Sequence, residues 1–181
     1  QSVDVRNESQ RIRQHPPRVS FGTGWVGDSP LEIFKDITAR HRLILISNRK
    51  ENATEVLEKG GIPKLYGLNV HSGTVYKWNR ACYGITDGKP HLRIENRVLP
   101  SGPTIVDEVA NAAFWLGMMH GMPDEYAKVS EKMDFDAAKG NFLRAARQGL
   151  GASFFWMKNQ KRIPADELIL KELLPIAKEG L

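Results

Sequence analysis

A nine-residue run in the middle of the chain places cations and a carboxylate at alternating positions. Residues 91–99 read His-Leu-Arg-Ile-Glu-Asn-Arg-Val-Leu. In a β-strand, alternate side chains point to opposite faces, so Arg93, Glu95 and Arg97 share one face. A carboxylate between two guanidinium groups suits a site that holds a metal ion beside the oxygens of a phosphate or carboxylate. The same spacing also fits a solvated sheet face with cross-strand ion pairs, so the pattern alone leaves both interpretations open.

A second group of candidates precedes this run. Residues 74–80 also read as a strand, on which Trp78 and Arg80 share a face with Tyr76. Arg80 is placed to reach a phosphate, and Trp78 either packs against a ligand or belongs to the core. His71 lies in a loop that we expect before this strand. It either donates to a substrate oxygen or is a plain loop histidine.

The surrounding pattern predicts the elements that position these residues. Apolar spacing and capping residues predict helices over residues 30–40, 52–59, 104–120, 136–150 and 164–178. Asp87-Gly88 predicts a hairpin turn between the two strands, and the aliphatic run 43–46 predicts a short buried strand. The helix over 104–120 is apolar almost all round, so we expect it to be central and buried.

The order of the elements favours one fold class. Strands come mostly early and helices late, which favours an α+β fold over a doubly wound parallel sheet. We expect an antiparallel sheet with a catalytic face, packed against several helices. Residues 1–20 are polar and contain Pro16 and Pro17, so we expect a loop or a loosely attached segment.

Composition limits the classes of partner and compartment. The 181 residues suffice for one domain with a sizeable core, and no apolar run approaches the roughly 20 residues that cross a bilayer. The net charge of +5 is scattered, and the aromatics 154–156 beside Lys158 and Lys161 are only a faint hint of the basic stripe with interleaved aromatics that a nucleic-acid site needs, so we favour an apolar strand and a solvated turn there. The single cysteine, Cys82, excludes an internal disulfide framework and fits a reducing cytoplasm. With no base adjacent in sequence, we expect its thiol to be structural rather than nucleophilic.

Three segments together resemble a known superfamily. They are residues 93–97 (Arg-Ile-Glu-Asn-Arg), 99–104 (Leu-Pro-Ser-Gly-Pro-Thr) and 107–114 (Asp-Glu-Val-Ala-Asn-Ala-Ala-Phe). They resemble the glutamine synthetase-like carboxylate–amine ligases, in which an Arg-x-Glu-x-Arg strand leads into a helix that opens near an Ala-Asn pair. The closer resemblance is to the glutamate–cysteine ligase family. Its bacterial members, some with appended CBS domains, have a segment similar to residues 71–80 (His-Ser-Gly-Thr-Val-Tyr-Lys-Trp-Asn-Arg).

The resemblance covers about residues 15–181 and implies an ATP- and magnesium-dependent ligase. Such enzymes join glutamate, through an acyl phosphate, to an amine, here most simply cysteine, and form a γ-glutamyl amide. By the resemblance, Glu95 is a metal ligand, Arg97 contacts the transferring phosphate or the glutamate, and Arg93 lies on the nucleotide side. An ion pair of Glu95 with either arginine is the alternative.

The resemblance also bears on what surrounds the chain. It implies the C-terminal portion of a single catalytic domain, whose further metal-binding carboxylates come from earlier strands. Residues before 71 contain no acid-rich strand, so we expect those carboxylates in an N-terminal half outside these residues and expect the isolated chain to be inactive. The protein could form a homo-oligomer. We do not expect it to bind a nucleic acid or a membrane. The competing hypothesis is a non-catalytic regulatory or ligand-sensing domain, against which the intact Arg93, Glu95 and Arg97 argue.

Overall fold

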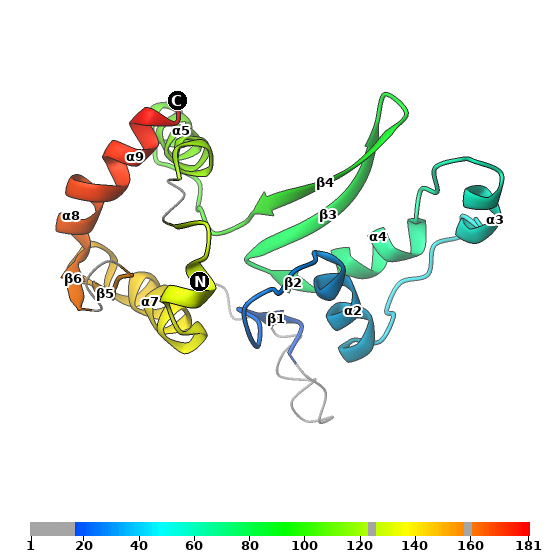
Figure 1. The fold of residues 1–181 in the computed structure, drawn as a ribbon, viewed down its shortest axis with the longest axis horizontal. Helices are drawn as coiled ribbons and strands as arrows, with labels where there is room; N and C mark the ends of the chain where they lie inside the picture. The colour runs from blue at the N-terminus through cyan, green and yellow to red at the C-terminus, as the bar shows by residue number, and fades with distance from the viewer. Residues whose placement is uncertain (1–16, 123–125, 158–160) are drawn as a thin grey trace. The chain divides into compact units, whose positions relative to one another are not determined.

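The computed structural model describes residues 17–122, 126–157 and 161–181. They mix helices with short sheets, which confirms the α+β class at this coarse level. The chain divides into two compact units, coloured along the sequence in Figure 1. Of the described residues, the first unit contains those from 17 to 22 and Val26–Val98, and the second contains Thr23–Trp25 and those from Leu99 onward. None of the described helices is long and apolar enough to cross a membrane.

The first unit is built around a β-hairpin. Its elements are β1 (Val19–Ser20), α2 (Leu31–Arg40), α3 (Ala53–Glu58), α4 (Tyr66–Gly73), β2 (Tyr76–Lys77), β3 (Asn79–Thr86) and β4 (Lys89–Asn96). Strands β3 and β4 pair antiparallel with Arg80 opposite Glu95, and β1 pairs parallel with β2. The turn at Asp87-Gly88 has φ angles of 50° and 72°, the left-handed region that this dipeptide favours. The predicted turn is confirmed, but the strand expected over residues 74–80 is wrong in its bounds: that range holds β2 and only the first two residues of β3. Because the turn is tight, pairing continues up to Thr86 and Lys89, and the second strand ends at Asn96 rather than at residue 99.

Local signals explain the first helices. The Ser29 hydroxyl accepts from the backbone N–H of Leu31 (3.2 Å) at the start of α2, which buries Phe34 and Ile37. The Asn52 side chain accepts from two backbone N–H groups at the start of α3. Both predicted helices are therefore confirmed to within a residue or two.

Three further predictions for this unit are wrong. Residues 43–46 form no strand, and their side chains are exposed, up to 82% for Ile46. No strand among the described residues pairs with this segment, and an unpaired backbone makes no β-ladder. The loop expected around His71 is instead helix α4. Most of the loop expected over residues 1–20 lies outside the described residues, but Val19–Ser20 form β1 rather than loop.

The second unit is mostly helical. Its elements are α5 (Ile105–Gly121), α6 (Val129–Lys132), α7 (Phe135–Gln148), the 3-10 turn η2 (Gly149–Gly151), β5 (Ser153–Phe155), β6 (Arg162–Pro164), α8 (Ala165–Leu168), the π-helical turn η3 (Ile169–Leu173) and α9 (Leu174–Glu179). Thr104 and Asp107 form a capping box at the start of α5. The indole of Trp25 donates to the Met133 carbonyl (2.8 Å) and meets the Phe135 ring edge-on.

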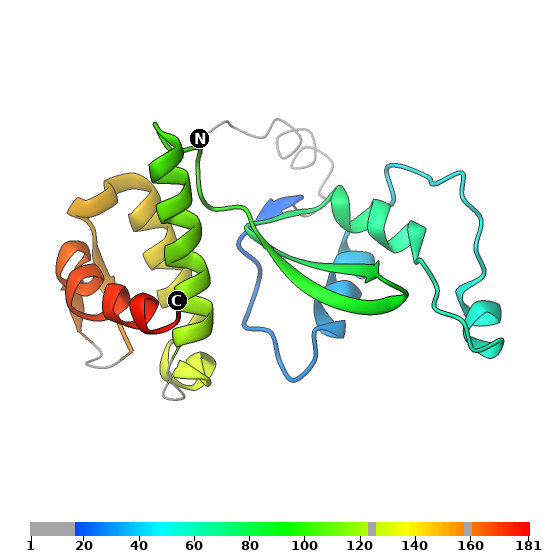
Figure 2. The same cartoon turned by 90° about the horizontal axis from the view of Figure 1, so that it is seen from above.

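Helix α5 packs on α9 through glycine. Figure 2 shows the C-terminal helix lying against α5. A Cβ atom on Gly117 would lie 2.1 Å from the Ala177 carbonyl oxygen, and one on Gly180 would lie 2.1 Å from the Gly117 carbonyl oxygen. The expectation of a central, buried α5 is wrong, because only Gly117 of this helix is buried and Ile105 is 78% exposed. The described residues cover α5 along this glycine side and leave much of its apolar surface open.

Candidate functional site

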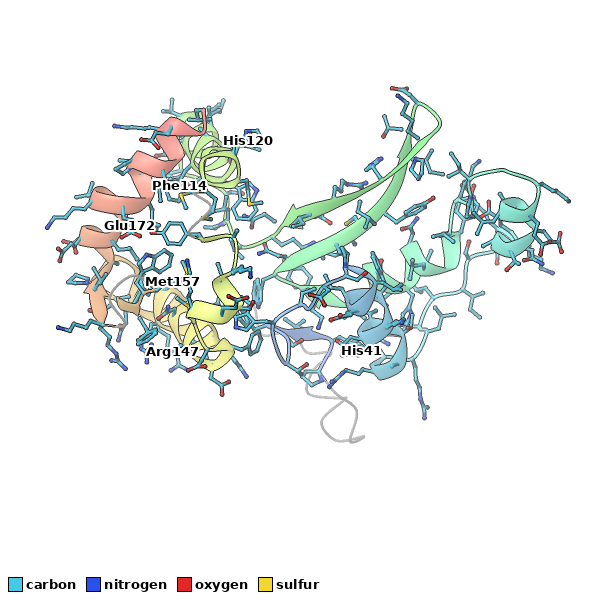
Figure 3. The ribbon with its side chains drawn as sticks, in the orientation of Figure 1. His41, Phe114, His120, Arg147, Met157 and Glu172 are labelled. Carbon is cyan, nitrogen blue, oxygen red and sulfur yellow. The ribbon has the colours of Figure 1, made fainter. Side chains whose placement is uncertain are left out.

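Three of the charged candidates, Arg80, Glu95 and Arg97, meet at a single carboxylate oxygen on one face of the β3–β4 hairpin. The Arg80 Nη2 atom lies 2.8 Å from Glu95 Oε2, and the Arg97 Nη2 atom lies 3.1 Å from the same oxygen. The Cys82 sulfur lies 3.5 Å from it. Register places Arg80 directly opposite Glu95, so both side chains leave the same face of the pair. The side chains along this hairpin are drawn in Figure 3.

The charges of this cluster favour the binding of an anion. The hydrogen bond from Arg97 holds the pKa of Glu95 below its ordinary value, and the charge of Arg80 acts in the same direction. The Glu95 side chain is 43% exposed, whereas both arginines are largely covered. Two guanidinium groups around one carboxylate leave a net positive charge. Such a surface attracts phosphate or carboxylate groups.

Arg97 is held from two further directions. It lies one residue past β4, yet its backbone N–H donates to the Trp78 carbonyl (2.9 Å) and continues the pairing. Its guanidinium lies over the Tyr76 ring, 4.9 Å from the centroid. The Tyr76 ring in turn meets Trp78 edge-on at 5.5 Å. Among the contacts described, the indole of Trp78 therefore supports the cluster through Tyr76.

Arg93 lies on the predicted face but apart from the Glu95 cluster. Its Nη1 atom is 3.4 Å from His91 Nε2, and within the described residues no carboxylate pairs with it. The guanidinium crosses over Gly84, where an added Cβ would lie 2.6 Å from Nη1. Arg93 is thus a cation with no described counter-charge, next to a position where a side chain would obstruct it.

The structure places His71 away from these contacts. His71 lies in α4, buried, and its Nε2 atom has no hydrogen-bond partner among the described residues. It lines an open hollow of about 710 Å³ together with His41, Arg40 and Arg42. Burial, then the charge of Arg18, lowers the pKa of His41. No described contact links His71 to Glu95, so its predicted ligand-binding role stays a prediction.

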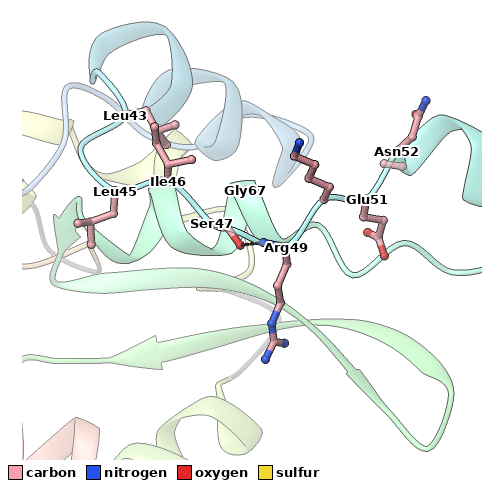
Figure 4. Close-up of a pocket in the computed structure, with 10 residues that line it drawn as sticks. Leu43, Leu45, Ile46, Ser47, Arg49, Glu51, Asn52 and Gly67 are labelled. Carbon is pink, nitrogen blue, oxygen red and sulfur yellow. Dashed lines mark hydrogen bonds between the residues drawn. The ribbon is translucent and has the colours of Figure 1, made fainter.

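A second open hollow, of about 660 Å³, lies beside the segment that leads to α3 (Figure 4). Its walls include the exposed side chains of Leu43, Leu45 and Ile46. The backbone N–H of Arg49 donates to the Ser47 hydroxyl (3.2 Å), and the Arg49 guanidinium lies over the Tyr66 ring. The sequence reasoning missed this hollow because it assigned residues 43–46 to a buried strand.

The cluster on its own does not make a magnesium site. No group of three or more His, Cys, Asp or Glu side chains in the described part of the chain could hold a metal ion. The described contacts of the Glu95 carboxylate all reach Oε2, and none reaches Oε1. Glu95 Oε1 therefore has the chemistry of one magnesium ligand, and the described residues do not complete the set.

Comparison with known proteins gives no relative: no protein-family model, curated protein or solved structure matches this chain. The residue that the sequence reasoning left out of the site is Cys82. The sequence reasoning missed it because it ended the first strand at residue 80, whereas β3 continues to Thr86 and places Cys82 two positions after Arg80 on the same face.

Proposed function

We propose that this chain supplies an anion-binding wall in the active site of an ATP- and magnesium-dependent carboxylate–amine ligase similar to the glutamate–cysteine ligases. The observation that carries the proposal is the convergence of Arg80 and Arg97 on Glu95 across one hairpin face. The spacing Arg-x-Glu-x-Arg that suggested the family places Glu95 and Arg97 on this face, and Arg80 joins them from the paired strand.

The proposed reaction has two steps. The γ-carboxylate of glutamate attacks the terminal phosphorus of ATP, the bond to the bridging oxygen breaks, and ADP leaves. The amine then attacks the acyl carbon of the acyl phosphate, phosphate leaves, and the nitrogen loses a proton as the amide forms. Negative charge accumulates on the transferring oxygens, so cations held in place beforehand lower the barrier.

Each arginine has a role that its contacts support. Arg97, fixed by Glu95 and by the Tyr76 ring, contacts the transferring phosphate or the glutamate. Arg93, which has no described counter-charge, is available to the nucleotide phosphates. Arg80 keeps the Glu95 carboxylate ionised and adds positive charge beside it. In this proposal, the remaining magnesium ligands come from outside the described residues.

The test is ADP release by the full-length protein that contains this chain, with magnesium, ATP, glutamate and a set of amines that includes cysteine. We expect release that depends on cysteine. Arg97→Ala should lower kcat by about 100-fold, the scale seen when one group that stabilises a developing charge is removed. Lys89→Ala is the matched control, because it removes one positive charge from the exposed end of the same strand. Release with a different amine would keep the ligase chemistry and change the acceptor.

One observation favours a second candidate, the non-catalytic ligand-sensing domain. Arg80 and Arg97 both already pair with Glu95, and the described residues do not complete a metal site. This candidate predicts that glutamate or ATP binds, measured by calorimetry, while no amine gives ADP release. Absence of ADP release with every amine would therefore overturn the ligase proposal.

A further inference from the structure

The chain's single thiol lies between the charged groups of the candidate site. Cys82 is buried on β3, two residues after Arg80 and on the same face. The Arg80 Nε atom lies 3.0 Å from the Cys82 sulfur and donates to it. The thiol lies 3.5 Å from Glu95 Oε2, within reach to donate to that oxygen. One side chain thus contacts both members of the Arg80–Glu95 ion pair.

The contacts of the thiol with Arg80 and with Glu95 constrain the orientations of both side chains. With its Nε–H directed at the sulfur, the Arg80 guanidinium turns its Nη2 atom toward Glu95. The thiol adds a third donor to the oxygen that already accepts from Arg80 and Arg97. Three donors on Oε2 leave Oε1 without a contact from the described residues. The Glu95 carboxylate is therefore held by hydrogen bonds to Oε2, while Oε1 stays available to a ligand.

The chemistry of the thiol suits this position. A buried thiol is a small apolar group with a weak donor and a weak acceptor, so it bridges a cation and an anion without adding charge. Alanine would fill similar space and offer neither function, whereas serine would keep both. A purely packing role therefore predicts that alanine is tolerated and that serine, which is more polar, is the worse replacement.

We propose that Cys82 is a positioning residue, whose thiol orients the Arg80 guanidinium and the Glu95 carboxylate for ligand binding. The effect of Cys82 on catalysis rests on the proposed ligase function. The hydrogen bonds that Cys82 makes can be tested without measuring enzyme activity. Oriented groups matter at such a site because electrostatic stabilisation depends on donors that need no reorganisation during the reaction.

The first measurement uses NMR of the 181-residue chain labelled with ¹⁵N. We expect the Arg80 Nε–H proton to exchange with water about tenfold faster in Cys82→Ala, because it loses its acceptor, and to recover protection in Cys82→Ser. Tyr83→Phe is the control. It removes a hydrogen bond to the Pro63 carbonyl from the opposite face of the same strand, so it loosens the hairpin without touching Arg80. Unchanged Arg80 exchange in Cys82→Ala would overturn the positioning role.

The second measurement is steady-state kinetics of the full-length protein. Cys82→Ala should lower kcat by about tenfold, and Cys82→Ser should recover most of it. In a Glu95→Gln background the same alanine substitution should cost less than in the wild-type protein, because part of its effect runs through that carboxylate. Equal losses in both backgrounds, or alanine better tolerated than serine, would contradict the proposal. An inactive wild-type protein would instead overturn the ligase function and leave the NMR result to decide the positioning.

Discussion

The glycine contact between α5 and α9 makes a sharp prediction for Gly117→Ala. The added Cβ would lie 2.1 Å from the Ala177 carbonyl oxygen and 2.8 Å from its carbonyl carbon. An ordinary C···O contact is about 3.3 Å. The neighbours are backbone atoms, which cannot rotate away as a side chain can, so the two helices must separate by about 1 Å.

The size of the effect follows from two opposing terms. Overpacking typically costs about 1–3 kcal/mol, and a backbone overlap of this size belongs at the upper end. Replacing glycine by alanine inside a helix stabilises the helix by about 1 kcal/mol, because alanine has the higher helix propensity. The free energy of unfolding should therefore fall by about 2 kcal/mol, which for a chain of this length lowers Tm by about 4–8 °C.

Gly140→Ala in α7 is the matched control. There the atoms near the added Cβ belong to the flexible end of Arg144, at 3.3 Å or more, so the propensity gain remains. This variant should raise the free energy of unfolding by about 0.5–1 kcal/mol. Thermal unfolding followed by circular dichroism, with hydrogen exchange of the α5 amides, measures both. If Gly117→Ala proves as stable as Gly140→Ala, the close α5–α9 packing is refuted.

Three further predictions concern pH and exposure. Because the pKa of Glu95 is lowered in the folded state, its ion pairs stabilise the protein above the ordinary glutamate value, and this contribution is lost as pH falls through the lowered pKa. Arg97→Ala should raise that pKa, which NMR of the carboxyl carbon measures; an unchanged value would contradict the hydrogen bond as its main cause. The lowered pKa of His41 predicts that stability declines as pH falls below about 6.5, because the folded state resists protonation, and that His41→Gln flattens this decline in pH-dependent melting. Ile46→Ser should change the free energy of unfolding, measured by urea titration, by less than about 0.5 kcal/mol because Ile46 is exposed. A loss of several kcal/mol would instead support the prediction that residues 43–46 form a buried strand.

The turn of the hairpin and the charged face of its second strand were predictable because their signals are local, whereas the first strand was expected at residues 74–80 and lies at Asn79–Thr86. Alternation along residues 91–97 assigned Arg93, Glu95 and Arg97 to one face, and Asp87-Gly88 has the backbone preference that its turn requires. The capping box at Thr104 and Asp107 is equally local, since both partners lie within one helical turn. In each case the determining contacts are made by residues close in sequence or fixed by strand periodicity.

Three other features of the fold were predicted wrongly, because hydrophobic periodicity does not show which segments pack against each other. The aliphatic run 43–46 has the composition of a buried strand, but a strand also needs a pairing partner, and the described residues provide none. The apolar surface of α5 indicated burial, yet its described packing runs through Gly117, a residue with no side chain to signal a contact. Helix α4 begins after Leu65 in a left-handed conformation, which sequence preference does not favour for leucine. The apolar pattern of the segment itself fixed none of these three features.

The place of Trp25 in the second unit has a consequence for how the chain folds. Its indole bonds to Met133, 108 residues later, so Val26–Val98 are topologically an insertion within the second unit. A loop of this length is entropically costly to close while it is unstructured, and long-range contacts of this kind slow folding. Prior folding of the inserted unit would spare part of that cost. The hairpin carrying Arg80 and Glu95 is therefore expected to gain protection from hydrogen exchange before the Trp25–Met133 contact forms.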